Sequence, residues 1–477
     1  MKNVIGRLKK FQISNSFVNA SFVYIIANGI GQGTTLLVNT FFTRYMTKSD
    51  YGLYSNYYSL VPVLVPIIGL NLYDGLANAY IDYKKEEIHI FRSSLLLLSV
   101  IWGSILSCLV IGFKIVIGGS MPLIAVAMAL VHSYGFFAVN YYLQSMNMEN
   151  QFIKKGIGLC APNILQALLG IIAVILCNNY ISRAVGSATG VAVCGIFGMI
   201  TICRMSWPRC NIEYWKYALR ISLPAIVSSL AMMIMQQCDK MMITEMIGSE
   251  ITAVYSLIYN IGYILYAVQQ ATGGVWQVWY YNTLEKKAYG NIPLVQKWYI
   301  FIMFVFATGL YMVAPEVIKI LSPNSYWHFE YVPPFIIGSY LMLMYSLYLS
   351  TAQYNKKTGV VSWIVSLAAI INVLLNYILI PCYGGIVAAY TTVVSYLFIF
   401  IISGLYLIIR KQYYFKFQYF CIFGIGVVLM GIIFYFVRNL TLIRYIIFMV
   451  VLIFELMYVY VKKEELKALL WSNTFGR

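Results

Sequence analysis

The sequence predicts an all-α polytopic membrane protein with about 14 transmembrane helices. Three observations support this fold class. The chain has 477 residues, of which 61% are hydrophobic and 10% are charged, whereas soluble domains carry roughly 25% charged residues. Apolar runs of about 20 residues, the length that spans a bilayer as a helix, recur along the chain. These runs are continuous and lack the period-two alternation of membrane β-strands, so helices are expected.

The apolar runs place a series of spans along the chain. Their predicted limits are 17–42, 52–73, 93–113, 121–144, 157–177, 183–203, 219–244, 252–276, 298–318, 334–353, 359–380, 385–409, 418–437 and 444–461. Most of the 33 Lys and Arg residues fall in the segments on the same side as the N-terminus. By the positive-inside rule, both termini are expected to be cytoplasmic. This placement also accounts for the net charge of +17 without nucleic-acid binding.

Short signatures occur twice, with nearly the same separation along the chain each time. They are Lys84-Lys85 and Lys286-Lys287, Lys154-Lys155 and Lys356-Lys357, and Tyr54-Ser55 and Tyr255-Ser256. Each copy falls within a set of six spans, an even number, so both sets enter the membrane in the same direction. We therefore expect two six-helix bundles in a parallel pseudo-twofold repeat. The predicted domains are an N-terminal lobe at 1–210, a C-terminal lobe at 211–412, and helices 13–14 with a cytoplasmic tail at 413–477.

Polar side chains form stripes on the first and eighth spans. On the first span the stripe comprises Asn28, Gln32, Thr35, Asn39 and Thr43, and on the eighth it comprises Ser256, Asn260, Tyr263 and Gln270. The spacing places each set on one helix face. One interpretation is that these residues hold helices together. The other is that they line a hydrated cavity between the bundles, which the occurrence of stripes on corresponding helices favours.

A few charged residues lie within or at the ends of spans. Asp239 and Lys240 lie near the outer end of the seventh span. A charge at the middle of the bilayer costs about 2.5–3.5 kcal/mol. Lys240 could extend to the interface or line the cavity, and Arg44 at the matching end of the first span has the same two options. Asp74 ends the second span on the cytoplasmic side. Asp239 and Asp74 are candidates for coupling to an ion.

Several motifs of enzymes and metal proteins are missing from the sequence. It has no G-x-x-x-x-G-K-[ST] and no H-E-x-x-H. The nine cysteines have no metal-ligand spacing, so we expect free thiols, no metal and no cofactor. No outer loop holds the carboxylate pair that a lipid-sugar glycosyltransferase would use, and the first six spans hold no mid-membrane carboxylate of the kind an exporter of organic cations would use.

The sequence resembles the oligosaccharide flippase branch of the MATE-like multidrug/oligosaccharidyl-lipid/polysaccharide exporter superfamily. The residues that carry this resemblance are Thr43-Arg44, Asp50-Tyr51-Gly52-Leu53-Tyr54, Gly69-Leu70, Ser222-Leu223-Pro224, Asp239-Lys240 and Val254-Tyr255-Ser256. The span layout matches over nearly the whole chain. The second copy has Ala253 where such proteins often have glycine.

The resemblance implies a flippase, not an enzyme, that moves a polyprenyl-pyrophosphate-linked oligosaccharide between leaflets of the bacterial cytoplasmic membrane by alternating access. Its pathway would make O-antigen, capsule or exopolysaccharide, and its partners would be membrane lipids and possible polymerases and glycosyltransferases. Arg44, Lys240 and Arg92 are candidate ligands of the anionic pyrophosphate. Two alternatives stay open: a MATE-type drug or metabolite exporter, and an integral membrane glycosyltransferase.

Overall fold

A computed structural model describes residues 27–465 except 28, 32, 119–120 and 150. The regular secondary structure of this part of the chain is entirely helical. Within it, 12 helices, α4 to α15, are long and apolar enough to cross a membrane. They coincide with predicted spans, and the two remaining spans hold a helix that ends at Tyr45 and the helix α2. The prediction of an all-α, multi-pass membrane protein is therefore confirmed.

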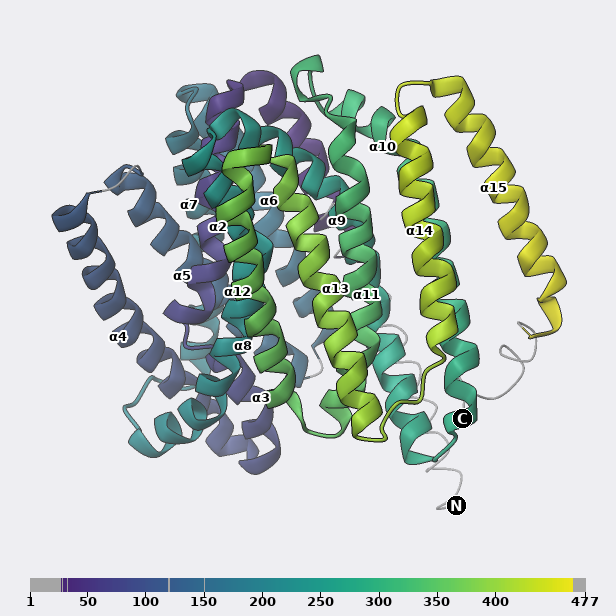
Figure 1. The fold of residues 1–477 in the computed structure, drawn as a ribbon. Helices are drawn as coiled ribbons and strands as arrows, with labels where there is room; N and C mark the ends of the chain where they lie inside the picture. Colours follow the sequence, from purple (N-terminus) through teal and green to yellow (C-terminus); the bar gives the residue numbers. More distant parts are fainter. Residues whose placement is uncertain (1–26, 28, 32, 119–120, 150, 466–477) are drawn as a thin grey trace. The chain divides into compact units, whose positions relative to one another are not determined.

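The chain divides into two compact units, Met1–Gln237 and Cys238–Arg477. Besides the helix that ends at Tyr45, the first unit contains α2 (Lys48–Ile68), α3 (Leu72–Asp82), α4 (Lys85–Ile117), α5 (Leu123–Met148), α6 (Phe152–Leu176), α7 (Tyr180–Met205) and most of α8 (Ile212–Met246) (Figure 1). The boundary between the units falls inside α8, which is one continuous helix. The lobe limits expected from the sequence, 210 and 412, stay predictions.

The second unit contains the end of α8 and all later helices. These are α9 (Ser249–Glu285), α10 (Ile292–Leu321), α11 (Val332–Tyr354), α12 (Thr358–Tyr383), α13 (Ile386–Ile409), α14 (Phe417–Val437) and α15 (Thr441–Val461). Three 3₁₀ turns, η1 (Tyr289–Asn291), η2 (Asn324–Tyr326) and η3 (Phe329–Tyr331), lie beside α10 and α11. Helices α14 and α15 pack against α10 and follow the part that resembles the first unit.

The packing inside one unit matches the packing inside the other. In the first unit α5 packs against α2 and α7, and α7 packs against α6. In the second unit α11 packs against α9 and α13, and α13 packs against α12. The helices correspond in chain order, so the duplication indicated by the short sequence signatures extends to the helix pairs that form each bundle.

Helix α2 ends at Ile68, before the predicted limit of 73, because the chain turns sharply there. Leu70 and Asn71 adopt positive φ angles of 48° and 51°, a conformation that costs side-chain-bearing residues energy. A Cβ atom on Gly69 would overlap the ring of Phe137 on α5. Only glycine permits this close approach, so α2 is fixed against α5 at the residue where its helix ends.

Helices α6 and α7 approach closely through small residues on α7. A Cβ atom on Gly190 would lie 2.6 Å from the backbone nitrogen of Gln166 on α6. Backbone atoms cannot move aside as a flexible side chain can. In lipid, where no hydrophobic effect drives helices together, such close backbone contacts supply much of the association energy.

Substitution Gly190→Ala is expected to destabilise the first unit by about 1–3 kcal/mol, because the added methyl group forces α6 and α7 apart. The measurement is the thermal midpoint of detergent-solubilised protein. Gly112→Ala in α4 is the matched control, since its Cβ would meet nothing within 4 Å and alanine favours helix. Equal midpoints for Gly190→Ala and wild type would contradict this account of the α6–α7 contact.

Candidate functional site

Asp239 lies in a buried polar site formed by four helices of the second unit. Its side chain, on α8, is 2% exposed. It accepts hydrogen bonds from Asn376 Nδ2 on α12 at 2.6 Å and from Thr392 Oγ1 on α13 at 2.8 Å. The hydroxyl of Tyr255 on α9 donates a third. Three neutral donors on three neighbouring helices thus converge on one carboxyl group.

A second layer of polar groups holds these donors in place. Asn372, one helical turn before Asn376 on α12, donates to Thr392 Oγ1 at 3.2 Å. The hydroxyl of Thr391 donates to Asn376 Oδ1. Buried polar groups in a membrane helix need such partners, since hydrocarbon offers none. These residues were not predicted from the sequence, although Asn372 and Asn376 are two amides spaced i, i+4 in an apolar span, a pattern that indicates a buried polar face.

Lys240 follows Asp239 directly and is also buried, with 7% of the residue exposed. Its ammonium group lies 4.4 Å from the ring centroid of Tyr259 on α9. A cation over an aromatic face is stabilised by the ring quadrupole, more strongly when both are removed from water. The second unit therefore holds a buried carboxyl group and a buried amino group next to each other in the sequence. The net charge of this pair changes when either group gains or loses a cation such as a proton.

The corresponding region of the first unit contains a buried cation. Arg183 on α7 is 6% exposed, and its guanidinium carbon lies 3.6 Å from the ring centroids of both Phe42 and Tyr54. In the sequence, Arg183 stands at the predicted start of the sixth span, 183–203. Tyr54 donates to Ser187 Oγ on α7 at 3.0 Å, whereas its counterpart Tyr255 donates to Asp239. Equivalent tyrosines thus lie beside opposite charges in the two units.

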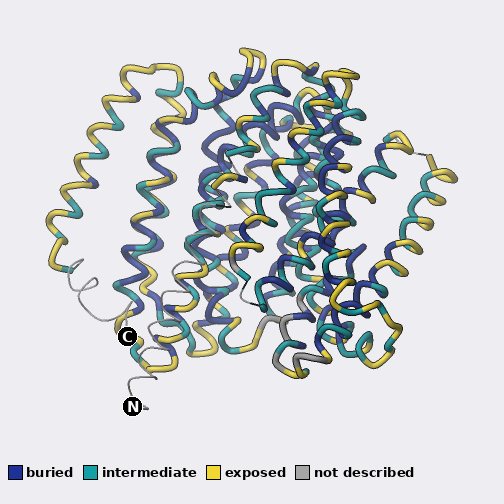
Figure 2. Tube along the Cα trace, turned by 180° about the vertical axis from the view of Figure 1, so that it is seen from behind, coloured by how far each residue is buried: buried dark blue, intermediate teal, exposed yellow. Residues whose placement is uncertain are grey.

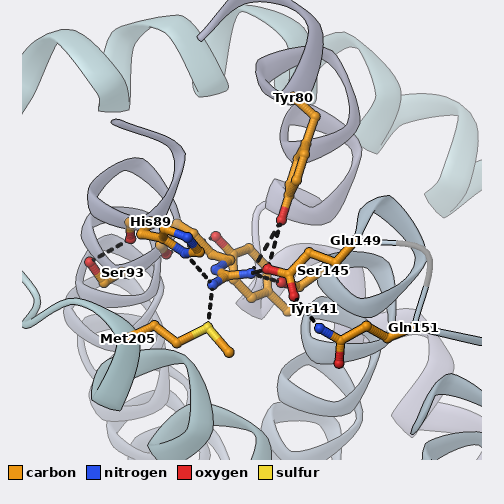
Figure 3. Close-up of polar contacts among 9 residues, drawn as sticks. Tyr80, His89, Ser93, Tyr141, Ser145, Glu149, Gln151 and Met205 are labelled. Atoms are coloured by element: carbon orange, nitrogen blue, oxygen red, sulfur yellow. Dashed lines mark hydrogen bonds and ion pairs between the residues drawn. The ribbon is translucent and has the colours of Figure 1, made fainter. Parts of the chain in front are cut away.

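Arg92 on α4 is at the centre of a hydrogen-bond network in the first unit, and Figure 3 shows the side chains that converge on it. It is fully buried and forms an ion pair with Glu149 at 2.5 Å. Its guanidinium nitrogens also contact Tyr80 Oη at 3.2 Å, His89 Nδ1 at 2.8 Å and the hydroxyl of Ser145. Because these partners come from α3, α4, α5 and the residue after α5, Arg92 fastens three helices.

Two further contacts extend the same network. Met205 Sδ, at the end of α7, lies 2.7 Å from Arg92 Nη2, and the Tyr141 hydroxyl donates to the Arg92 carbonyl at 2.9 Å. Burial raises the pKa of Tyr80, so its hydroxyl stays protonated and can donate to Glu149. A pyrophosphate bound by Arg92 would have to displace Glu149 or these neutral partners, so pyrophosphate binding by Arg92 stays a prediction.

The other predicted site residues are placed as follows. Arg44 is exposed near the end of the helix that stops at Tyr45, and Asn39 on that helix is buried. Thr35 and Gln270 are exposed, whereas Asn260 and Tyr263 are partly buried. Asn28, Gln32 and the side chain of Asp74 lie outside the described part of the chain. Cavity lining by these residues stays a prediction.

No group of three His, Cys, Asp or Glu side chains comes together as a metal site among the described residues. His132 is fully buried, with Nδ1 3.0 Å from the hydroxyl of Tyr57. This contact places the histidine in the core of the first unit. The groups described around Asp239 and Lys240 are a single carboxylate, one ammonium group and neutral hydroxyl and amide groups.

The sequence profile of a family described as polysaccharide biosynthesis protein matches residues 17–280, more than half of the chain. The chain belongs to this family. No curated protein sequence matches it significantly. The matched region covers the first unit from residue 17 onward, Asp239, Lys240 and most of α9.

Several solved structures share the fold of this chain. The lipid II flippase MurJ, in an inward closed conformation, matches with a TM-score of 0.71 and 15% identity over 94% of this chain and 99% of that one. An outward-facing multidrug resistance MATE family transporter matches with a TM-score of 0.57 and 16% identity over 82% and 95%. A mutant of the Vibrio cholerae MATE transporter VcmN matches with a TM-score of 0.57 and 11% identity, over 86% of this chain and 99% of that one. The MATE-like fold inferred from the sequence is thereby confirmed.

Glu149→Ala is expected to lower the stability of the protein by about 3–5 kcal/mol, because it leaves the buried guanidinium of Arg92 without its counter-charge. The measurement is the yield and thermal midpoint of monodisperse protein after extraction in mild detergent. Glu213→Ala, at an exposed position at the start of α8, is the control and should behave as wild type. An unchanged midpoint for Glu149→Ala would show that the ion pair contributes little to folding.

Proposed function

We propose that this protein is a flippase that moves a polyprenyl-pyrophosphate-linked oligosaccharide repeat unit from the inner to the outer leaflet for surface polysaccharide synthesis. The observation that carries the proposal is the match of residues 17–280 to the polysaccharide biosynthesis family. The fold shared with a lipid II flippase supports it, since that protein's name specifies a lipid-linked substrate. The site of action would be the bacterial cytoplasmic membrane, with both termini inside, as the distribution of basic residues indicates.

The substrate carries a pyrophosphate between its lipid and its sugars, so it needs cationic partners. Lys240 and Arg44 are the candidates in the two units. Lys240 is buried in the described conformation, so it would meet substrate in another state of an alternating-access cycle. Arg44 is exposed. The amide and hydroxyl groups of the polar stripes would hydrogen-bond the sugars, while the lipid tail stays in the bilayer.

Asp239 is the proposed coupling residue. Its carboxylate is surrounded by hydroxyl and amide groups, which could accommodate either a proton or a monovalent cation on the carboxylate. When such a cation binds, the Asp239–Lys240 pair changes from neutral to positively charged. The pair would then attract the pyrophosphate more strongly, which links binding of the ion to binding of the substrate.

A MATE-type exporter of drugs or metabolites is the second candidate, because MATE transporters share the fold. Mass spectrometry of lipid-linked sugars in a deletion strain separates the candidates. Accumulation of completed units on the inner leaflet would support the flippase. Unchanged lipid-linked sugars would support the exporter, and truncated units would indicate a glycosyltransferase. Glycosyltransferases and a polymerase of the same pathway would be the functional partners of the flippase.

Arg44→Ala and Lys240→Ala are each expected to reduce surface polysaccharide at least tenfold without lowering the amount of folded protein, since loss of one ionic contact weakens pyrophosphate binding by about 1.5–3 kcal/mol. Polysaccharide is measured by quantitative immunoblot, and folded protein by fluorescence-detected size exclusion.

The matched control is Arg204→Ala, an exposed arginine in the last turn of α7. It removes the same charge and should leave polysaccharide levels unchanged. Because Lys240 is buried, Lys240→Met serves as a second variant that keeps the length of the side chain. Wild-type polysaccharide levels in both Arg44→Ala and Lys240→Met would remove these residues from the proposed site.

Asp239→Asn is expected to abolish the response of transport to an ion gradient, because the neutral amide cannot bind the cation whose charge changes the affinity of the site. Flipping of a fluorescent lipid-linked oligosaccharide is measured in proteoliposomes with and without proton or sodium gradients. Glu245→Gln, at an exposed position near the end of α8, is the control. If Asp239→Asn keeps the wild-type ratio of rates with and without gradient, Asp239 is not the coupling residue.

A further inference from the structure

Two of the acidic side chains in the described part of the chain are buried, and their surroundings differ. Asp239 is 2% exposed and Glu455, on α15, is 7% exposed. Asp239 accepts hydrogen bonds from three donors on three helices, which suits an ionised carboxylate. Glu455 lies within a membrane-spanning helix beside a single hydroxyl group, that of Thr308 on α10.

The hydroxyl of Thr308 has more hydrogen-bond acceptors near it than it has hydrogens. Its oxygen lies 2.9 Å from the backbone carbonyl of Val305, one turn earlier on α10, and 2.8 Å from Glu455 Oε1. A hydroxyl carries one hydrogen and can also accept. Threonine in a helix ordinarily gives its hydrogen to the carbonyl of the preceding turn. When Thr308 gives its hydrogen to the Val305 carbonyl, the contact with Glu455 needs a second hydrogen, which a protonated carboxyl group supplies.

The alternative assignment, an ionised Glu455, is costly at this position. Thr308 would have to give its hydrogen to the carboxylate and leave the Val305 carbonyl without that bond. A full negative charge would then be stabilised by one neutral donor in a span that faces lipid, where isolated carboxylates are strongly disfavoured. The ionised form thus gives up the Thr308–Val305 hydrogen bond and also carries the desolvation cost of a buried charge.

We propose that Glu455 is a proton-binding site. It carries a proton as a neutral carboxylic acid and donates it in a hydrogen bond to Thr308, while Thr308 donates to Val305. The bound ligand is the proton itself, held between α10 and α15 and separate from Asp239.

This site also explains how α15 is attached. Arg444 and Glu455 are the buried residues of α15, and Figure 2 shows exposed residues along much of this helix. Arg444 forms an ion pair with Glu316 on α10 near one end of α15, and Glu455 bonds Thr308 further along it. Two polar contacts of different kinds, one ionic and one neutral, therefore hold α15 to the same helix.

The test uses the full chain in lipid nanodiscs treated with dicyclohexylcarbodiimide at neutral pH. This reagent reacts with the acid form of a carboxyl group: a carboxyl oxygen bonds to the central carbodiimide carbon, and the carboxyl proton moves to a carbodiimide nitrogen. Peptide mass spectrometry is expected to locate an adduct at Glu455. Glu316, on the opposite helix and ion-paired with Arg444, is the internal control and should give none, although it is more exposed.

Glu455→Gln removes the acid and keeps its shape, and its amide can donate to Thr308, so this variant is expected to fold as wild type and to lack the adduct. Infrared difference spectra between wild type and Glu455→Gln give an answer that does not depend on access by the reagent. Loss of a protonated carboxylic acid C=O band in the variant supports the proposal. Loss of carboxylate bands alone, or an adduct at Glu316 and none at Glu455, overturns it.

Discussion

Membrane-spanning helices need partners inside the protein for their polar and charged side chains, because the hydrocarbon around them offers no hydrogen bonds. This constraint explains the arrangement of every buried charge described above. Arg92 has a carboxylate and several neutral partners, Asp239 has three neutral donors, and Arg183 has aromatic faces. In each case the partners come from several helices, so the same contacts that stabilise the charge also hold the helix bundle together.

The duplicated bundle shows how one fold accommodates two kinds of site. The helix pairs are the same in both units, and Tyr54 and Tyr255 occupy matching places in the sequence. Tyr54 donates to a hydroxyl beside the buried Arg183, whereas Tyr255 donates directly to Asp239. Duplication preserved the packing, and the two copies diverged in the sign of the charge beside a shared tyrosine. A protein that must attract an anion and also respond to a cation would gain from such divergence.

The helical spans and the repeat could be predicted because lipid imposes continuous apolar runs that are visible in the sequence. The hydrogen-bond and ion-pair partners of each charged side chain could not be predicted, because they come from distant segments of the sequence. Nothing near Asp239 in the sequence indicates Asn376 or Thr392, and the break after Ile68 depends on the ring of Phe137. The surroundings of the basic residues were especially hard to predict. The sequence does not distinguish Arg92 from Arg44, yet Arg92 is fully buried and ion-paired, whereas Arg44 is exposed.

That distinction bears on how a pyrophosphate would be recognised. A cation contributes to binding an anion only to the extent that its charge is not already balanced. The charge of Arg92 is balanced by Glu149, and displacing that carboxylate from a buried arginine would cost energy comparable to the new bond. The charge of Lys240 is adjacent to that of Asp239, whose carboxylate is the proposed binding site for a proton or a monovalent cation. Under the proposed function, Lys240 would therefore change its affinity for an anion with the ion gradient and Arg92 would not, because only at Arg92 does an ion pair that holds the bundle together have to break.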